Sequence, residues 1–319
     1  MPERVLAADV GGTNIRVALV DANGKILKRE ESDTPNRATA EEICRSIAAD
    51  ANKILHETES LGSVQKFGLA LPAIIDYSTS SVVQSPNLPH LNGFGIGQYM
   101  AEHTGLDVEL ENDATAAAIG EHWLGGAEGA NNVLCVTLGT GVGGGLIIHG
   151  NVVRGPDGTA GEVGHICVEP DGPLCGCGSH GCVEQFASAT AVVRQAKERL
   201  PGAPSSPLSS LEHFTASQVF DAAKAGDPLS IEVFEVAGYY LGIVLAGLIN
   251  ILNPEVIVIT GGVSGAWEMF IERTRAEVEK RAFQRPAERA KIVRGQLGDD
   301  AGILGAAKRV LADADKGSS

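Results

Sequence analysis

The sequence predicts a duplicated fold of two similar lobes, each presenting one glycine-rich turn. With 319 residues, the chain is long enough for about two domains at roughly 150 residues each. Residues 5–20 read VLAADVGGTNIRVALV, and residues 133–148 read VLCVTLGTGVGGGLII. Aligned without gaps, both segments have the order strand, glycine-rich turn, strand. One repeat is too few for a solenoid, so it indicates a duplication.

The individual elements follow from hydrophobic periodicity and from capping residues. A helix over 40–57 is expected because Thr39 and Glu42 form a capping box ahead of a helical apolar stripe. The first half otherwise predicts a hairpin with strands 5–10 and 15–20, strands 67–71 and 106–110, and an alanine-rich helix through 123. The second half predicts the hairpin 133–148, helices near 188–200, 216–225, 228–251, 267–283 and 300–312, and strands 256–260 and 291–294.

The charge balance excludes one class of function. Lys and Arg total 25 against 40 Asp and Glu, a formal charge of −15. A surface this acidic repels a phosphate backbone, which argues against general nucleic-acid binding. An anionic substrate would need local neutralisation by backbone amides, a metal ion or both. The N-terminus does not resemble a targeting peptide, and the longest apolar run, 241–252, is too short to span a bilayer. A cytosolic location is expected.

The first glycine-rich turn, Asp9-Val10-Gly11-Gly12-Thr13-Asn14, is a candidate phosphate site. Adjacent glycines between two strands let backbone N–H groups point into one concavity that suits phosphate oxygens. The Asp9 carboxylate could hold a hydrated Mg²⁺ beside those phosphates. Taken alone, the segment is explained equally well as a plain hairpin turn.

The second turn, TLGTGVGGG at 137–145, contains five glycines. Their cost in conformational entropy makes a mere turn a poor explanation. The segment is not a P-loop, because no Gly-Lys-Ser/Thr follows, and a following strand argues against a dinucleotide fingerprint. As the duplicate of the first turn, it predicts phosphate binding.

Three of the six cysteines combine with a histidine into a candidate metal site. His165, Cys175, Cys177 and Cys182 lie within eighteen residues and make a complete tetrahedral zinc set. A disulfide within Cys175-Gly176-Cys177 would be strained and would leave one cysteine over. Four protein ligands leave no open position, which predicts a structural zinc. The other cysteines, Cys44, Cys135 and Cys167, sit singly in apolar patterns and are expected to be buried.

Two groups of carboxylates are candidates for chemistry. Glu111-Asn112-Asp113 ends a strand and opens a helix, where Asn and Asp are preferred N-caps. The alternative is that Asp113 acts as a base and Asn112 hydrogen-bonds a polyol. Glu162 and Glu184 flank the zinc ligands and either orient them or accept hydrogen bonds from sugar hydroxyls.

In their order and spacing, these motifs resemble the ROK family (repressors, open reading frames, kinases) of bacterial sugar kinases. The resemblance covers nearly the whole chain. Its segments are DVGGTNIR at 9–16, SPNLPHLNG at 85–93, ENDATAAAIGE at 111–121, TLGTGVGGGLI at 137–147, AGEVGH at 160–165, CGCGSHGCVE at 175–184 and NPEVIVITGGVSG at 253–265. One departure is Ala73, which stands where many members have glycine. The family's repressors carry an N-terminal helix-turn-helix, whereas this chain begins at the first strand, so the DNA-binding branch is not expected.

The resemblance implies an α/β fold of two duplicated actin-like (ribonuclease-H-like) domains around a central cleft, with a small zinc knuckle. The first domain would span 1–113 and the second 114–299, with the zinc site at 165–182. The final helix, about 300–312, would pack back on the first domain.

The activity implied by the resemblance is ATP-dependent phosphorylation of a hexose, with glucose converted to glucose 6-phosphate as the expected reaction. The alternatives are other hexoses or N-acetylhexosamines: N-acetylmannosamine, N-acetylglucosamine, mannose, fructose and allose. A non-catalytic sugar sensor of the same fold and an actin-like ATPase are rivals from other classes. ATP would bind with Mg²⁺, and a homodimer or homotetramer is expected. Neither nucleic acid nor a membrane is an expected partner.

The resemblance also assigns roles to individual residues. Asp113 would be the catalytic base. The sugar would be held by Asn87, Asn112, Asp113, Glu162, His165 and Glu184, with His165 shared with zinc. The nucleotide phosphates would contact Asp9, Gly11, Gly12, Thr13, Asn14, Gly139, Thr140 and Gly141, and the adenosine would lie near Gly261 and Gly262.

Overall fold

The computed structural model of this chain describes residues 4–35 and 39–311. The chain divides into two compact units. Unit 1 comprises Met1–Gly129, Gly145–Gly161 and Leu297–Ser319, and unit 2 comprises Ala130–Gly144 and Glu162–Gln296. The boundary expected at residue 113 therefore differs from the division in the structure.

Unit 1 is built on a five-stranded sheet of order β3-β2-β1-β4-β7. The hairpin predicted at the N-terminus is present, and its two strands pair antiparallel. The third strand of this meander adds to it, whereas the two later strands run parallel to the first. The strands are β1 (Arg4–Val10), β2 (Asn14–Asp21), β3 (Ile26–Asp33), β4 (Lys66–Leu71) and β7 (Asp107–Asn112).

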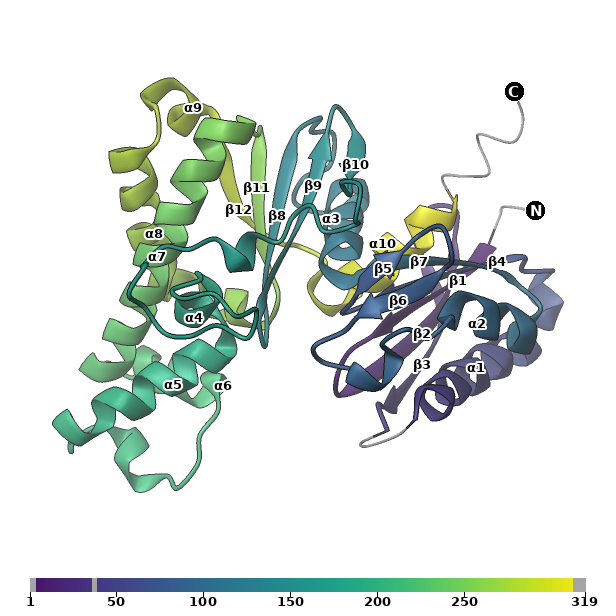
Figure 1. The fold of residues 1–319 in the computed structure, drawn as a ribbon, viewed down its shortest axis with the longest axis horizontal. Helices are drawn as coiled ribbons and strands as arrows, with labels where there is room; N and C mark the ends of the chain where they lie inside the picture. The colour runs from purple at the N-terminus through teal and green to yellow at the C-terminus, as the bar shows by residue number, and fades with distance from the viewer. Residues whose placement is uncertain (1–3, 36–38, 312–319) are drawn as a thin grey trace. The chain divides into compact units, whose positions relative to one another are not determined.

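Helices cover both faces of this sheet (Figure 1). On one face α1 (Ala40–Glu57) and α2 (Ile96–Thr104) enclose the larger apolar core. On the other face α3 (Asp113–Leu124) and α10 (Ala301–Leu311) pack on each other, with α10 against β1 and β4. A Cβ on Gly305 of α10 would lie 1.7 Å from the backbone oxygen of Ala116 in α3, so glycine permits this close packing. This contact explains why α3 belongs to unit 1 rather than to the second domain.

The second sheet repeats the design of the first. Its order is β10-β9-β8-β11-β12, again an antiparallel meander followed by parallel strands. The strands are β8 (Val133–Leu138), β9 (Val142–Ile148), β10 (Asn151–Val153), β11 (Val256–Thr260) and β12 (Lys291–Arg294). The duplication predicted from the two glycine-rich segments is thus confirmed in strand order as well as in sequence.

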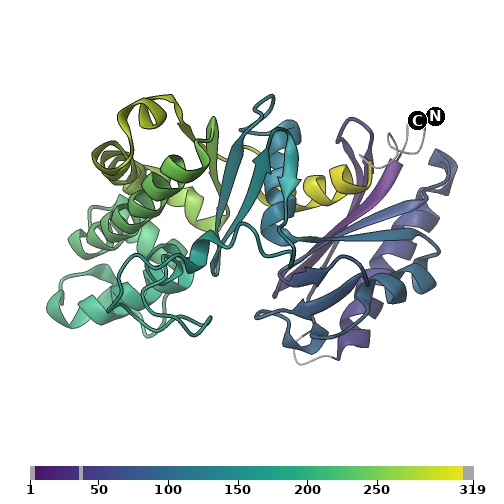
Figure 2. The ribbon, with the colours of Figure 1, turned by 45° about the horizontal axis from the view of Figure 1, so that its top comes forward.

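The helices of unit 2 pack around α7 (Pro228–Leu252). Figure 2 shows α8 (Trp267–Arg281) running beside it. The others against it are α4 (Glu184–Ala187), α5 (Ala189–Arg199), α6 (Ala216–Lys224) and α9 (Gln284–Arg289). Among the described residues, α7 alone is long and apolar enough to cross a membrane, by length and composition only. It confirms the helix predicted near 228–251, of which the apolar run 241–252 is the second half, and its contacts with five helices are those of a core helix.

Several short elements were not expected from the sequence. They are β3, β10, α2, α9, β5 (Ile74–Asp76) and β6 (Ser81–Gln84). The strand β3 reads ILKREESD and lies at the edge of its sheet, where charged residues protect an open strand and hide the apolar alternation.

Candidate active site

The predicted site residues of unit 1 gather at one edge of its sheet. The strands β1, β4 and β7 are parallel, and Leu71 pairs with Asn112 in the register of the last two. Their carboxyl ends therefore bring together the turn after β1, the Pro72–Ala73 segment after β4, and Asn112–Asp113 at the end of β7. This is the edge at which parallel α/β sheets bind ligands.

The first glycine-rich turn joins β1 to β2 and is held from one side. The Gly11 amide donates to the Asn14 carbonyl at 2.8 Å, and the Thr34 hydroxyl and amide donate to the carbonyls of Gly11 and Thr13, both at 2.7 Å. Gly12 and Thr13 are exposed, and their amides have no acceptor within the described part of the chain. Such amides are available to phosphate oxygens.

Asp9 lies at the base of this turn, with its side chain 21% exposed and 3.9 Å from the Arg16 guanidinium. Burial raises the pKa of Asp9 to about 6, Arg16 opposes the rise, and Asp299 adds to it. A Cβ on Gly302 of α10 would lie 2.8 Å from the Asp9 carboxyl carbon, so glycine there leaves room for the carboxylate. A poorly solvated carboxylate beside a phosphate turn fits a hydrated Mg²⁺, whose charge would offset the cost of burial.

The structure separates the roles of Asn112 and Asp113. Asn112 is the N-cap of α3, and its side-chain oxygen accepts from the Thr115 amide at 3.0 Å. Its side-chain amide donates to the Ala73 carbonyl at 3.2 Å. Asp113 is the first residue of the helix, is half-buried, and accepts from the Ala114 amide at 2.8 Å. Asn112 and not Asp113 therefore supplies the side-chain cap of α3.

A buried ion network lies directly behind these two residues. Glu111 is fully buried, and its carboxylate accepts from the Tyr77 hydroxyl at 2.6 Å and from the Arg154 guanidinium, with Nε to Oε2 at 3.1 Å. It also accepts from the Asn112 amide at 3.2 Å, and the Arg309 guanidinium of α10 lies 3.7 Å away. Burial and the Glu111 carboxylate raise the pKa of Tyr77, so its hydroxyl stays protonated as a donor. These contacts hold Glu111 in place and so fix the position of the backbone that leads to Asp113.

Sequence reasoning missed Tyr77, Arg154 and Arg309. The sequence feature that indicated such partners was the position of Glu111 at the end of a buried strand, because a buried carboxylate requires partners. Their identity was not readable, since all three are distant in sequence.

Loss of Arg154 is expected to destabilise the protein, because it leaves a buried carboxylate short of one cationic partner. We expect Arg154→Met to lower the free energy of unfolding by about 2–3 kcal/mol, measured by urea denaturation. The matched control is Arg275→Met, which removes an exposed ion pair with Glu272 and should cost less than about 1 kcal/mol. Equal decreases in the free energy of unfolding for the two variants would show that the Glu111 network contributes no more stability than an exposed ion pair.

Asn87 also lies near the carboxyl ends of the parallel strands of the first sheet. The Ser85 hydroxyl donates to the Pro72 carbonyl and the Ser85 amide to the Asn92 side chain, both at 2.7 Å. These bonds tie the loop to the end of β4. Asn87 is exposed, and a Cβ built on Gly12 would lie 3.8 Å from the Asn87 Cβ. The predicted sugar ligand therefore lies beside the predicted phosphate turn.

The second glycine-rich turn joins β8 to β9 and is held from α5. The Ala189 amide donates to the Gly139 carbonyl and the Thr190 hydroxyl to the Thr140 carbonyl, both at 2.8 Å. The Gly139 amide in turn donates to the Gly141 carbonyl at 2.9 Å. The carbonyls thus point into the protein, and Thr140 is exposed.

Glu184 connects this turn to the cysteine cluster. Its Oε2 accepts from the Val142 amide at 3.0 Å, and its Oε1 lies 3.6 Å from the Cys175 sulfur. A Cβ on Gly141 would lie 2.5 Å from Glu184 Oε2. Glycine at 141 therefore makes the contact between the carboxylate and the turn possible.

Gly261 and Gly262 follow β11, which runs parallel to β8. Both therefore lie at the same edge of the second sheet as the second turn. Gly261 has a φ of +87°, and a Cβ there would lie 2.7 Å from the Leu138 carbonyl oxygen. Only glycine satisfies both conditions.

The four predicted zinc ligands come together in unit 2. Their ligand atoms all lie within 4.8 Å of one another. The sulfurs of Cys177 and Cys182 are 3.7 Å apart, and the Cys175 sulfur is 3.6 Å from the His165 Nδ1. Metal–sulfur bonds of about 2.3 Å in a tetrahedron place sulfurs about 3.8 Å apart, so these residues fit a zinc ion. One expectation is wrong: Cys44 and Cys135 are buried, but Cys167 is exposed, because it lies in the irregular segment around the cluster rather than in a core element.

Glu162 is a second carboxylate next to the cluster. The His165 Nε2 lies 3.8 Å from its Oε2, so one ring nitrogen faces the cysteines and the other faces Glu162. Burial raises the pKa of Glu162, His165 opposes the rise, and Glu184 adds to it.

We propose that the cluster binds one structural zinc per chain, which elemental analysis of the purified protein would measure. Cys177→Ser is expected to lower both the zinc content and the midpoint of thermal unfolding, because structural zinc contributes directly to folding free energy. Cys167→Ser is the control, since this exposed cysteine is outside the ligand set and should leave the zinc in place. A metal-free wild-type protein of full stability would refute the assignment.

Comparisons with known proteins show which family and which proteins this chain is similar to. The sequence matches the ROK family over residues 5–313. It is 37% identical to a glucokinase from Thermotoga maritima, with 96% of this chain and 97% of that protein covered. It is 32% identical to an N-acetylmannosamine kinase from Haemophilus influenzae, with 99% of each covered. The structure is similar to that of a ROK family glucokinase from Streptomyces griseus in complex with glucose and AMPPNP. That similarity has a TM-score of 0.82 at 35% identity and covers 96% of this chain and 98% of the other.

Proposed function

The chain belongs to the ROK family, and from this premise we propose that it transfers the terminal phosphoryl group of ATP to the 6-hydroxyl of glucose. One observation carries the proposal: Asp113 and the first glycine-rich turn lie at the same edge of one sheet. A base and a phosphate site at one edge are what phosphoryl transfer to an alcohol requires. The similarity to glucokinases supports glucose as the acceptor.

In this proposal the two turns bind the nucleotide. The exposed amides of Gly12 and Thr13 in unit 1, and the turn of Gly139, Thr140 and Gly141 in unit 2, would donate to phosphate oxygens. Gly261 and Gly262 would lie by the adenosine. Asp9 would hold Mg²⁺ through the waters of the ion, and the bound ion would neutralise charge on the phosphates.

Asp113 would accept the proton from the sugar hydroxyl as the oxygen attacks the phosphorus, and ADP would depart with the electrons of the broken P–O bond. A hydroxyl is a weak nucleophile, so a carboxylate that both orients and deprotonates it lowers the barrier. The Glu111 network would hold this carboxylate at a fixed angle. The remaining hydroxyls would contact Asn87, Asn112, Glu162, His165 and Glu184.

The similarity to an N-acetylmannosamine kinase favours an N-acetylhexosamine as a second candidate substrate. A coupled assay of ADP release should be run with glucose, mannose, fructose, allose, N-acetylglucosamine and N-acetylmannosamine. We expect the highest kcat/KM with glucose. A higher value with an N-acetylhexosamine would replace glucose as substrate and leave the kinase assignment intact.

A further inference from the structure

The loop 154–161 follows β10 and leads directly into Glu162, one of the predicted sugar ligands. It reads RGPDGTAG and closes on itself, because the Ala160 amide donates to the Arg154 carbonyl at 2.9 Å. The next turn of the chain begins at Glu162, whose carbonyl accepts from the His165 amide at 3.2 Å. The place of this loop therefore fixes where the segment that carries Glu162 and His165 begins.

The middle of the loop lies against the segment that contains β5. Gly158 has a φ of +72°, and a Cβ built on it would lie 3.0 Å both from the Ile75 carbonyl oxygen and from the Tyr77 ring carbon Cε2. A methyl group is too large for that space unless the loop and the ring move apart, and residues other than glycine rarely adopt such a φ. Glycine at 158 therefore allows the loop to pack directly on the backbone of β5 and on the Tyr77 ring.

The start of the loop contacts the same tyrosine. The Arg154 guanidinium lies over the Tyr77 ring, 5.3 Å from its centroid, and donates to the buried Glu111 carboxylate. The Tyr77 hydroxyl donates to that carboxylate as well, at 2.6 Å. Tyr77 thus contacts the start of the loop, its middle, and the strand end that leads to Asp113.

We propose that Tyr77 is a positioning residue for sugar binding: it holds the loop 154–161 in place, and through the loop the backbone that carries Glu162. The inference rests on the proposed function, because it concerns the binding of the sugar substrate of that reaction. In this role Tyr77 acts through its contacts with Gly158 and Glu111 rather than on the reacting atoms. Since the two glycine-rich turns lie outside the loop, displacing the loop should weaken the binding of sugar and leave the binding of ATP unchanged.

The first test displaces the loop with Gly158→Ala. We expect KM for glucose, or for whichever sugar of the panel has the highest kcat/KM, to rise at least about fivefold, while kcat stays within about threefold and KM for ATP within about twofold. Calorimetric titration with the same sugar in the absence of ATP should show the same loss of affinity. Gly150→Ala is the matched control, because Gly150 has the same φ of +72° but a Cβ there would have no described atom within 4 Å. It adds the same backbone strain without displacing the loop, so it should keep wild-type kinetics.

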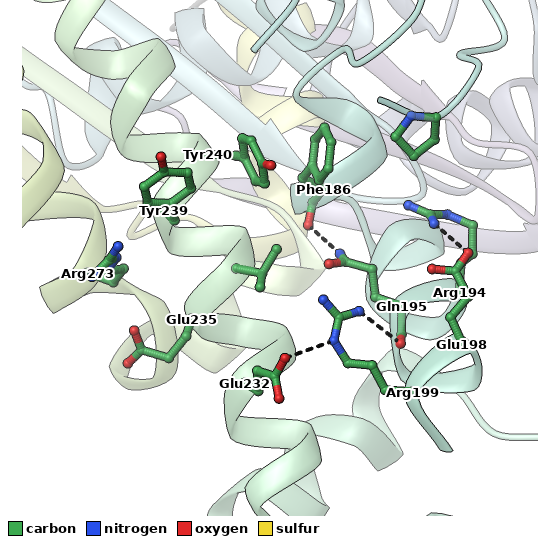
Figure 3. Close-up of a pocket in the computed structure, with 12 residues that line it drawn as sticks. Phe186, Arg194, Gln195, Glu198, Arg199, Glu232, Glu235, Tyr239, Tyr240 and Arg273 are labelled. Atoms are coloured by element: carbon green, nitrogen blue, oxygen red, sulfur yellow. Dashed lines mark hydrogen bonds and ion pairs between the residues drawn. The ribbon is translucent and has the colours of Figure 1, made fainter. Parts of the chain in front are cut away.

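The second test removes the Tyr77 hydroxyl and keeps its ring. Tyr77→Phe deletes the hydrogen bond to the Glu111 carboxylate, and we expect kcat/KM for the same sugar to fall at least about tenfold while KM for ATP stays within about twofold. The matched control is Tyr239→Phe, in a groove between helices of unit 2 (Figure 3). There the Arg273 guanidinium lies 5.0 Å from the Tyr239 ring centroid, and the hydroxyl accepts from the Arg281 guanidinium at 3.4 Å. A tyrosine with the same kinds of partner, outside the loop and its contacts, should tolerate the change.

Circular dichroism would confirm that each variant is folded, and Tyr77→Phe decides the question if Gly158→Ala does not fold. An active wild type whose Gly158→Ala and Tyr77→Phe variants match their controls in kinetics with the sugar would overturn the inference and leave the proposed function intact. An equal rise in KM for ATP would overturn it too, because the effect would then not be on sugar binding. A wild type that phosphorylates no sugar would contradict the proposed function itself, on which the inference rests.

Discussion

Replacing Asp113 with asparagine is expected to lower kcat for glucose phosphorylation by at least about a hundredfold. General-base contributions are typically about 10²–10⁴-fold, and a base that also orients its nucleophile lies toward the upper end. A hundredfold loss corresponds to a barrier increase of roughly 3 kcal/mol. Binding of glucose should weaken far less, because an amide still hydrogen-bonds a hydroxyl. The free energy of unfolding should change by less than about 1 kcal/mol, since Asn112 rather than Asp113 caps the helix.

The experiment pairs turnover with glucose affinity by calorimetry. Asp107→Asn is the matched control, because the same change is made at an exposed residue at the start of the same strand and should leave kcat unaltered. If kcat of Asp113→Asn stays within about threefold of wild type, Asp113 is not the base. Glu162 is then the next carboxylate to test.

Replacing Gly141 with valine is expected to reduce kcat/KM for ATP by at least about tenfold, through a higher KM, a lower kcat or both. A Cβ at this position would lie 2.5 Å from Glu184 Oε2, so Glu184 would have to release the Val142 amide. The added side chain would also obstruct the approach of phosphate to the turn. The fold should survive, because the end of a flexible side chain can move aside.

Gly247→Ala is the control for this variant. It adds a Cβ in unit 2, near the C-terminal end of α7, where nothing lies within 4 Å, and helix propensity predicts a small gain in stability. Its ATP kinetics should equal those of wild type. Unchanged ATP kinetics in Gly141→Val would mean that the second turn is a plain hairpin turn with no role in ATP binding.

The sequence predicted the features that depend on local pattern. The two turns, the cap region of α3 and the four zinc ligands each lie within a short segment whose residue types and spacing specify the geometry. The capping box of Thr39 and Glu42 is likewise present at the start of α1. The duplication was readable because both hairpins keep the same order of strand, glycine-rich turn and strand.

Features that depend on tertiary contacts were not readable. Arg154 and Arg309 reach Glu111 from segments distant in sequence, and no local pattern distinguishes them from surface arginines. The unit boundary was misplaced for the same reason, because glycines of α3 and α10 meet only in the folded protein. The link from Glu184 to the Val142 amide also joins two distant segments, so the connection through Glu184 between the cysteine cluster and the second turn was not expected.

Phosphoryl transfer from ATP to glucose is tested most directly by phosphorus NMR of the reaction mixture. With wild-type protein, Mg²⁺, ATP and glucose, the signal of the γ-phosphate should disappear while equal amounts of ADP and a phosphate ester on the sugar 6-oxygen appear. The Asp113→Asn variant should leave the spectrum nearly unchanged over the same time. Persistence of ATP with every hexose, or conversion to ADP and inorganic phosphate without a sugar phosphate, would contradict the assignment.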